Sequence, residues 1–358
     1  MIFLLLVMVF VFHPPSALAL GEELLPDSRA LESVLPEEVK ELLDGQSPGA
    51  LPEEGLLKRI WDGFLRQLRS ASAGAFHTAG IILAVTVICA LADSLDGIGK
   101  VPRFVLLSAV TAVSTAALAD FNSYMEMGFS ALQTLSDFSH VLLPCLSTAA
   151  AATGATASAA AKYAATAMFM DILLSLGRRV IMPAVCGYAA LSVSAAAVGN
   201  GSLKAAKRLM KNICQYLLTG ISLAFTGWLA LSGVISGTAD SVTARLTKTA
   251  VSAALPVVGS VLSDAAGTLA AAISAVRGTV GVFGMLVVLC VCMGPFAALG
   301  VRYVVYKLAA AVCECVSDSK LAELIDAFGT CFGMVLALNG VGALMMLVSV
   351  FSLMRTVT

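Results

Sequence analysis

The residues that could do chemistry in this chain are few and scattered. Its three histidines, His13, His77 and His140, lie far apart, and none stands beside a carboxylate or cysteine cluster. The nucleophile elbow, the zinc-protease helix motif and the glycine-rich phosphate loops are all absent. The residues therefore give no positive sign of an enzyme, and we predict a protein with no catalytic residues and no cofactor.

The nine cysteines are the next candidates, and all lie in or beside apolar segments. The pairs Cys290/Cys292 and Cys313/Cys315 have one residue between them, a spacing found in some metal sites, but no histidine lies near either pair. Small buried apolar side chains are the simpler interpretation. We predict neither a metal site nor a disulfide framework.

A basic cluster has the densest positive charge in the chain. Its members recur on successive turns of one helical face: Lys204, Lys207, Arg208 and Lys211. Lysine and arginine concentrate on the cytoplasmic side of a membrane, where they attract anionic headgroups. The pattern predicts a cationic helix lying on the cytoplasmic membrane surface, with anionic lipid as its partner.

A second group of polar residues lies late in the chain, between Thr238 and Arg277, where proline and glycine also interrupt the helical pattern. Irregular backbone at membrane depth needs protein or water around it. We expect an interfacial or re-entrant pair of helices here, with a further span as the alternative. The candidate pore or partner-contact residues are Asp240, Arg245, Lys248, Pro256, Gly259 and Asp264.

Asp171 is an isolated acid inside an apolar stretch. An ionisable residue at membrane depth is a functional candidate by default. The alternative is an ion pair with Lys162 or Arg178. If Asp171 is functional, it favours a permease.

The composition shows which kind of element must position these residues. Of 358 residues, 59% are apolar and only 13% are charged, and the mean hydropathy is +0.92. Soluble domains carry about 25% charged residues, so the chain is predicted to be a membrane protein. Its positive charges are spread between apolar segments, which argues against a nucleic-acid partner.

The N-terminal part differs from the rest. An apolar run too short to span a bilayer, Ile2–Phe12, precedes the small-residue site Ala17–Ala19, which predicts a cleaved signal peptide over 1–19, with a retained anchor as the alternative. Residues 20–72 form an acidic extracytoplasmic arm that ends in an amphipathic helix, Leu56–Leu68. Packing of that helix on protein is an equal alternative.

Residues 73–358 are predicted to be an all-α, multi-pass membrane domain with about six to eight transmembrane helices. Lys100 and Arg103 indicate that residues 93–103 are cytoplasmic. Between Asp120 and Ser139 we expect an external loop, because the segment is acidic and contains no lysine or arginine. Val280–Val301 then crosses inward and leaves Arg302 and Lys307 in the cytoplasm.

The late polar segment also resembles a known family. The residues that carry the likeness are Gly237-Thr238-Ala239-Asp240, then Arg245 and Lys248, then Leu255-Pro256-Val257-Val258-Gly259 and Leu262-Ser263-Asp264-Ala265. On these residues the chain resembles the stage III sporulation protein AE family, over most of residues 70–358.

The resemblance implies a non-enzymatic subunit of a channel or secretion-like complex in the mother-cell membrane around the forespore. It implies partners among the stage III sporulation proteins AA to AH and, indirectly, the stage II sporulation protein Q. A homo-oligomer is a further alternative. The different function class that stays open is a stand-alone permease for a small solute.

Overall fold

The computed structural model describes residues 40, 56–95, 103–152, 156–199, 201–254, 259–316 and 319–354, and for residues 229–254 and 259–279 it describes the backbone alone. Within these residues the chain is entirely helical, as predicted. The long elements are α4 (Leu56–Leu95), α5 (Arg103–Ala152), α6 (Thr156–Leu176), the π-helix η2 (Gly177–Ile181), α7 (Met182–Val198), α8 (Gly201–Ala254), α9 (Gly259–Val316) and α10 (Ser319–Met354). The expected signal peptide and residues 20–55 of the acidic arm, apart from Lys40, lie outside the described residues.

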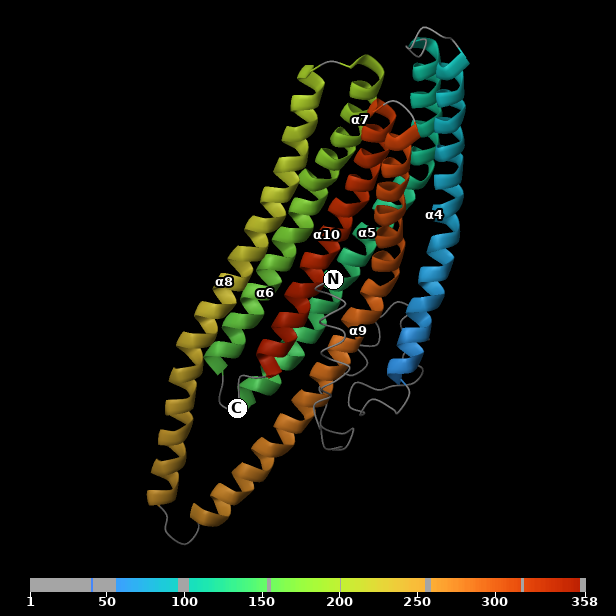
Figure 1. Cartoon of the computed structure of the whole chain (residues 1–358). Helices are drawn as coiled ribbons and strands as arrows, with labels where there is room; N and C mark the ends of the chain where they lie inside the picture. The colour runs from blue at the N-terminus through green and yellow to red at the C-terminus, as the bar shows by residue number, and fades with distance from the viewer. Residues whose placement is uncertain are drawn as a thin grey trace.

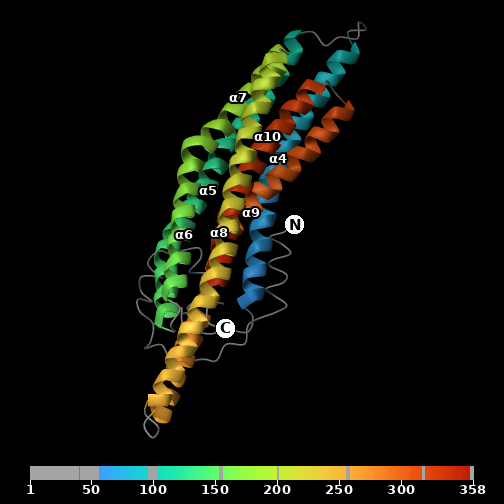
Figure 2. The same cartoon turned by 90° about the vertical axis from the view of Figure 1, so that its left-hand side faces the viewer.

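The helices form an elongated up-and-down bundle (Figures 1 and 2). At the upper end in Figure 1, α4 is followed by α5, α7 by α8, and α9 by α10. The two ends of the bundle are called upper and lower from here on. Leu95, where α4 ends, and Arg103, where α5 begins, therefore lie at the same end as the basic cluster, as expected for segments on one side of a membrane.

Five helices in the described part of the chain are long and apolar enough to cross a membrane: Lys58–Ala92, Phe104–Thr148, Tyr163–Val198, Val280–Val316 and Lys320–Phe351. The multi-pass all-α class is thus confirmed, whereas the count of six to eight spans is not. The two longest helices, α8 and α9, are also much longer than the hydrocarbon core of a bilayer is thick. At 1.5 Å per residue the 54 residues of α8 and the 58 of α9 measure about 80 and 87 Å, against a hydrocarbon core of about 30 Å.

The core is built around α9 and α10, which pack along each other and against α5. Close approach depends on glycine at particular positions. A Cβ on Gly128 of α5 would lie 2.5 Å from Val335 Cγ1 of α10, and one on Gly284 of α9 would lie 2.5 Å from Leu142 Cδ2 of α5. Small residues let helix backbones approach in this way within membranes.

One helix contains a π turn. In the sequence, residues 164–198 form two apolar stretches separated by Gly177, Arg178 and Arg179. In the structure α6, η2 and α7 are continuous, and the Met182 N–H bonds to the Gly177 carbonyl five residues back. Pro183 has no N–H to donate to the preceding turn, and a single wide turn accommodates that loss.

Two expected boundaries are wrong for the same reason. The expected external loop Asp120–Ser139 lies inside α5, and the amphipathic helix Leu56–Leu68 is the first part of α4 and does not end at Leu68. Charge and hydropathy mark where a helix changes environment, and a long helix continues beyond the membrane without ending there.

Candidate functional site

The predicted basic cluster occupies the first turns of α8, at the upper end of the bundle. It does not form a separate helix lying across that end, because the same helix continues downward along α7 and α6. Lys204 forms an ion pair with Glu323 of α10, with Nζ 3.1 Å from Oε1, and Lys207 Nζ lies 5.6 Å from the centre of the Tyr188 ring of α7. Arg208 is exposed and Lys211 is half-buried.

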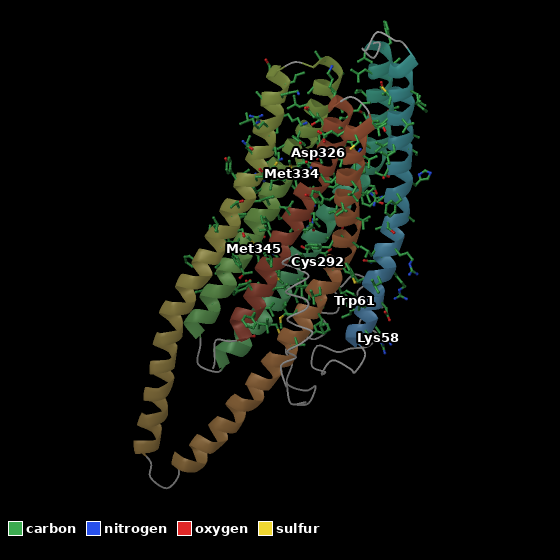
Figure 3. The ribbon with its side chains drawn as sticks, viewed as in Figure 1. Lys58, Trp61, Cys292, Asp326, Met334 and Met345 are labelled. Atoms are coloured by element: carbon green, nitrogen blue, oxygen red, sulfur yellow. The ribbon has the colours of Figure 1, made fainter. Side chains whose placement is uncertain are left out.

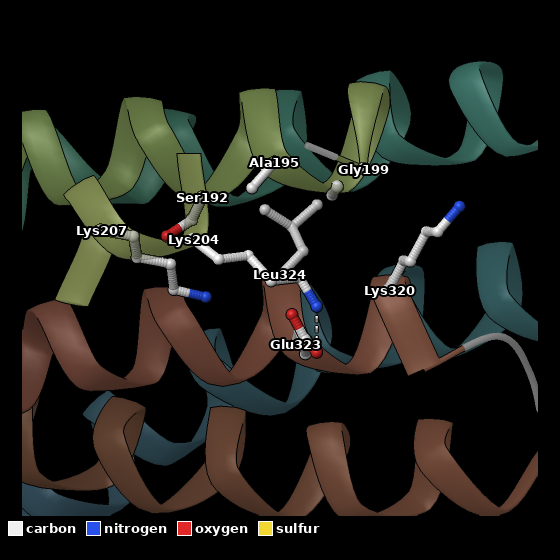
Figure 4. Close-up of a pocket in the computed structure, with 9 residues that line it drawn as sticks. Ser192, Ala195, Gly199, Lys204, Lys207, Lys320, Glu323 and Leu324 are labelled. Carbon is white, nitrogen blue, oxygen red and sulfur yellow. Dashed lines mark hydrogen bonds and ion pairs between the residues drawn. The ribbon is translucent and has the colours of Figure 1, made fainter. Parts of the chain in front are cut away.

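A small pocket lies between these three helices (Figure 4), and its volume is about 60 Å³. The pocket collects lysines from two chain segments, since Lys320 of α10 joins Lys204 and Lys207 of α8. Its complete lining is Ser192, Ala195, Ala196, Gly199, Lys204, Lys207, Lys320, Glu323 and Leu324. Burial lowers the pKa of Lys207, while the nearby carboxylates of Glu323 and Asp326 act in the opposite direction.

The turn from α7 to α8 brings the pocket together. Gly199 adopts a left-handed conformation, with φ at +74°, and its N–H donates to the Ala195 carbonyl at 2.9 Å. Glycine takes this conformation at no steric cost and so ends α7 sharply. A Cβ on Gly199 would lie 3.8 Å from Lys320 Nζ, which places that ammonium group beside the turn.

A neutralised charge pair lies next to the pocket on α10. Lys307 Nζ of α9 donates to Asp326 Oδ1 at 2.6 Å and to Thr330 Oγ1 at 2.9 Å. Figure 3 shows Asp326 near the upper end of α10, whereas Lys58 lies at the lower end of α4. Asp326 is thus paired with Lys307, and Glu323 is the acidic residue that lines the pocket itself.

The second notable site is Arg302 of α9, whose side chain is 2% exposed. Its Nη2 lies 3.6 Å from Asp120 Oδ2 of α5, and its Cζ lies 3.3 Å from the centre of the Tyr124 ring. Thr78 Oγ1 of α4 donates to the same carboxylate oxygen at 2.9 Å. One buried cation therefore joins three helices.

The polar groups around Arg302 are incompletely satisfied. Its Nε and Nη1, and the buried hydroxyl of Tyr306 one turn further on, have no hydrogen-bond partner among the described residues. Burying a charged donor without a partner is costly. The site stores unfavourable free energy that the ion pair and the aromatic contact only partly offset.

The sequence analysis did not predict this pair, because it assigned the two residues to opposite sides of a membrane. Asp120 was assigned to an external loop and Arg302 to the cytoplasm, but both lie inside long helices and face each other. Arg302 follows the uninterrupted apolar run Val280–Val301, so a span appeared to end there. The sequence signal that could have revealed the pair was an ionisable residue, Arg302, directly after a long apolar run. Recognising the pair also required Asp120 to be placed within a helix.

The described contact of Asp171 is not the expected ion pair with Arg178, and the side chain of the alternative partner, Lys162, lies outside the described residues. The Asp171 side chain is 61% exposed and contacts His140 of α5, with Oδ1 3.3 Å from Nε2, whereas Arg178 donates to Gln133 Oε1 at 2.5 Å. Asp171 therefore lies on the outer surface of the bundle, whereas Arg302 with Asp120 forms an interior ion pair among the described side chains.

The late polar segment spans the lower parts of α8 and α9, which project beyond the other helices (Figure 1). Asp240, Arg245 and Lys248 fall in α8, and Gly259 and Asp264 fall in α9. Pro256 lies outside the described residues. The structure places the basic cluster and this segment at opposite ends of α8, so the two candidate sites are separate.

The described side chains hold no group of three or more histidine, cysteine, aspartate or glutamate residues placed to bind a metal. Cys290, Cys292 and Cys313 are buried, and Cys315 is exposed.

The family model of the stage III sporulation protein AE family matches residues 38–356, which is most of the chain. The chain belongs to this family. Among curated proteins, the stage III sporulation protein AE of Bacillus subtilis (strain 168) is 23% identical over 253 residues, which are 69% of this chain and 63% of that relative. This member of the family thus matches less than two thirds of the relative's length. No solved structure matches it.

Proposed function

We propose that this chain is a non-enzymatic membrane subunit of a channel or secretion-like complex that links the mother cell and the forespore. Membership of a sporulation family and the long apolar helices support this assignment. The proposed location is the mother-cell membrane around the forespore. The lysine-rich upper end then faces the mother-cell cytoplasm, in keeping with the positive-inside rule.

The observation that carries the proposal is the projecting hairpin of α8 and α9. These helices are far longer than a bilayer requires, and the part beyond the bundle contains the late polar segment. With the upper end cytoplasmic, this hairpin faces the space between the two membranes. A subunit that contacts neighbours there needs such a projection, and a protein acting alone does not.

Co-purification from sporulating cells tests the proposal. A tagged chain extracted in mild detergent should bring down other stage III sporulation membrane proteins of the AA to AH set, with the stage II sporulation protein Q associated indirectly. Reversing two hairpin charges, Arg245→Glu with Lys248→Glu, should weaken that recovery, whereas Arg66→Glu in the exposed part of α4 should not. A chain that extracts alone and whose deletion leaves spore formation intact would refute the proposal.

The alternative is a stand-alone permease, and the buried Arg302–Asp120 pair is the observation in its favour. Interior ionisable residues often mark a transport path. Reconstituted protein should then move a solute across liposomes, and Asp120→Asn should stop transport while Asp171→Asn, on the outer surface, should not. Absence of transport across panels of ions and metabolites would remove this alternative.

A further inference from the structure

Residues 133–140 of α5 and residues 171–180 of α6 and η2 share one outer surface of the bundle, because two side-chain contacts join them. This surface is called the α5–α6 face from here on, and Figure 2 shows α5 and α6 side by side. Asp137 and Arg179 are both exposed on it. Among the described residues, neither of them has an ion pair or a hydrogen bond. The face therefore presents an acid and a base whose charges no described side chain neutralises.

Arg179 lies at membrane depth. It belongs to Tyr163–Val198, one of the stretches long and apolar enough to cross a membrane. The stretch has 36 residues, and a hydrocarbon core of about 30 Å takes about 20 residues of helix. Any run of about 20 consecutive residues within this stretch includes Arg179, so the core contains this arginine whichever part of the stretch crosses it. A charged side chain at that depth is costly against lipid, and it almost always faces protein or water.

The heights of the two charges along the bundle are similar. Arg178 donates to Gln133 Oε1, which places these two residues at the same height. From there α5 descends four residues to Asp137, and η2 rises one residue to Arg179. At 1.5 Å per residue the two charged residues differ in height by about 7.5 Å, which is within the combined reach of their side chains. Copies of the chain inserted in the same direction present both groups at these heights, so Arg179 of one copy can meet Asp137 of another.

The α5–α6 face also has room for a neighbouring helix and a balanced charge. An open hollow of about 370 Å³ runs along α6 and η2. The face has two aspartates and two arginines, so it is complementary to itself and not to a partner of one charge sign. Charged and apolar side chains together line the hollow: Asp171, Ile172, Ser175, Leu176, Arg179 and Val180.

We propose that the α5–α6 face binds a second copy of this chain within the membrane, with Arg179 of one copy paired with Asp137 of the other. Contact between copies removes both charges from lipid and gives each an opposite charge. The same pair forms in a reciprocal dimer and in a ring, where α6 of one copy meets α5 of the next. This inference rests on the membrane-spanning helices and not on membership of a complex.

Self-association of the full-length chain tests the proposal. Two differently tagged forms are co-expressed in a bacterium that does not sporulate and extracted in mild detergent, and capture of one tag should recover the other. Arg179→Asp in both forms, or Asp137→Arg in both, places like charges together and should lower that recovery roughly tenfold or more. The matched controls reverse exposed charges on α4, Arg66→Asp and Asp62→Arg, and should leave recovery within about twofold.

Combining the two reversals separates pairing from folding. When one form carries Arg179→Asp and the other carries Asp137→Arg, opposite charges meet again at every contact, so each variant should recover the other although neither recovers itself. The double variant should likewise recover itself. Low recovery in the mixture, or full recovery with either single reversal, would overturn the pair, and no recovery with the natural chain would overturn self-association. No other sporulation protein is present, so a failure here is distinct from a failure of the proposed function.

Discussion

Arg302 is the residue whose environment is furthest from what its chemistry prefers. It lies almost fully buried with one carboxylate at 3.6 Å, an aromatic face at 3.3 Å and two N–H groups without partners among the described residues. Buried ion pairs contribute little net stability, but removing one partner leaves an uncompensated charge. The pair therefore acts mainly by fixing how α4, α5 and α9 meet, and its loss should be felt strongly.

The first prediction follows from the difference between the small net contribution of the intact pair and the large cost of removing one partner. Asp120→Asn should lower the free energy of unfolding by about 3 kcal/mol, the lower end of the range for breaking a buried pair, because Asp120 is 27% exposed and Tyr124 still contacts the arginine. Adding Arg302→Met should recover most of the loss. Denaturant unfolding in detergent micelles would measure both. The exposed neighbour Glu126→Gln should change stability by less than about 0.5 kcal/mol, and a similar loss there would argue against a special role for the pair.

At the scale of elements, hydropathy predicted which segments are helices but not where the helices end. Val280–Val301 was predicted to be an apolar crossing helix, and it lies within the long apolar helix α9. The segment Asp120–Ser139 appeared to be a loop because its charges are all acidic, yet it is the middle of α5 and packs its apolar side chains inward. A charge on one face of a long helix does not interrupt the helix, and no periodicity in one segment shows which distant helix will neutralise it.

Close packing between helices makes the next prediction. Gly128→Ala would place a Cβ 2.5 Å from Val335 Cγ1 and 3.0 Å from Asn339 Nδ2, and a β-branched neighbour in a buried position has little room to move. We expect a loss of about 1–3 kcal/mol in unfolding free energy, the usual cost of overpacking.

Gly80→Ala is the matched control. Gly80 lies on the exposed face of α4, where a Cβ would have no heavy atom within 4 Å, so no loss is expected. If both substitutions have the same effect, the contact between α5 and α10 is not as close as described.

At the scale of the whole molecule, the low fraction of charged residues predicted a membrane protein. The positions of its lysines and arginines predicted which end faces the cytoplasm. The basic cluster Lys204, Lys207, Arg208 and Lys211 was recognised from the sequence. The sequence could not show which of these residues line the pocket and which lie on the surface. Lys320 and Glu323 lie more than a hundred residues later, and only the return of α10 to the upper end brings them to α8. Pockets assembled from separate helices depend on topology, and topology is what a one-dimensional pattern specifies least.

The last prediction is that the upper and lower ends of the bundle are accessible from opposite sides of the membrane. In a chain whose exposed cysteines Cys186 and Cys315 are replaced by serine, Ser202→Cys reports on the upper end and Thr148→Cys on the lower end, since both positions are exposed. With the upper end cytoplasmic, a membrane-impermeant maleimide added to intact spheroplasts should label Thr148→Cys, and it should label Ser202→Cys only after permeabilisation. Labelling of both without permeabilisation would contradict a bundle that crosses the membrane. Labelling of Ser202→Cys alone would reverse the orientation, and the lysine-rich upper end would then lie outside the cytoplasm.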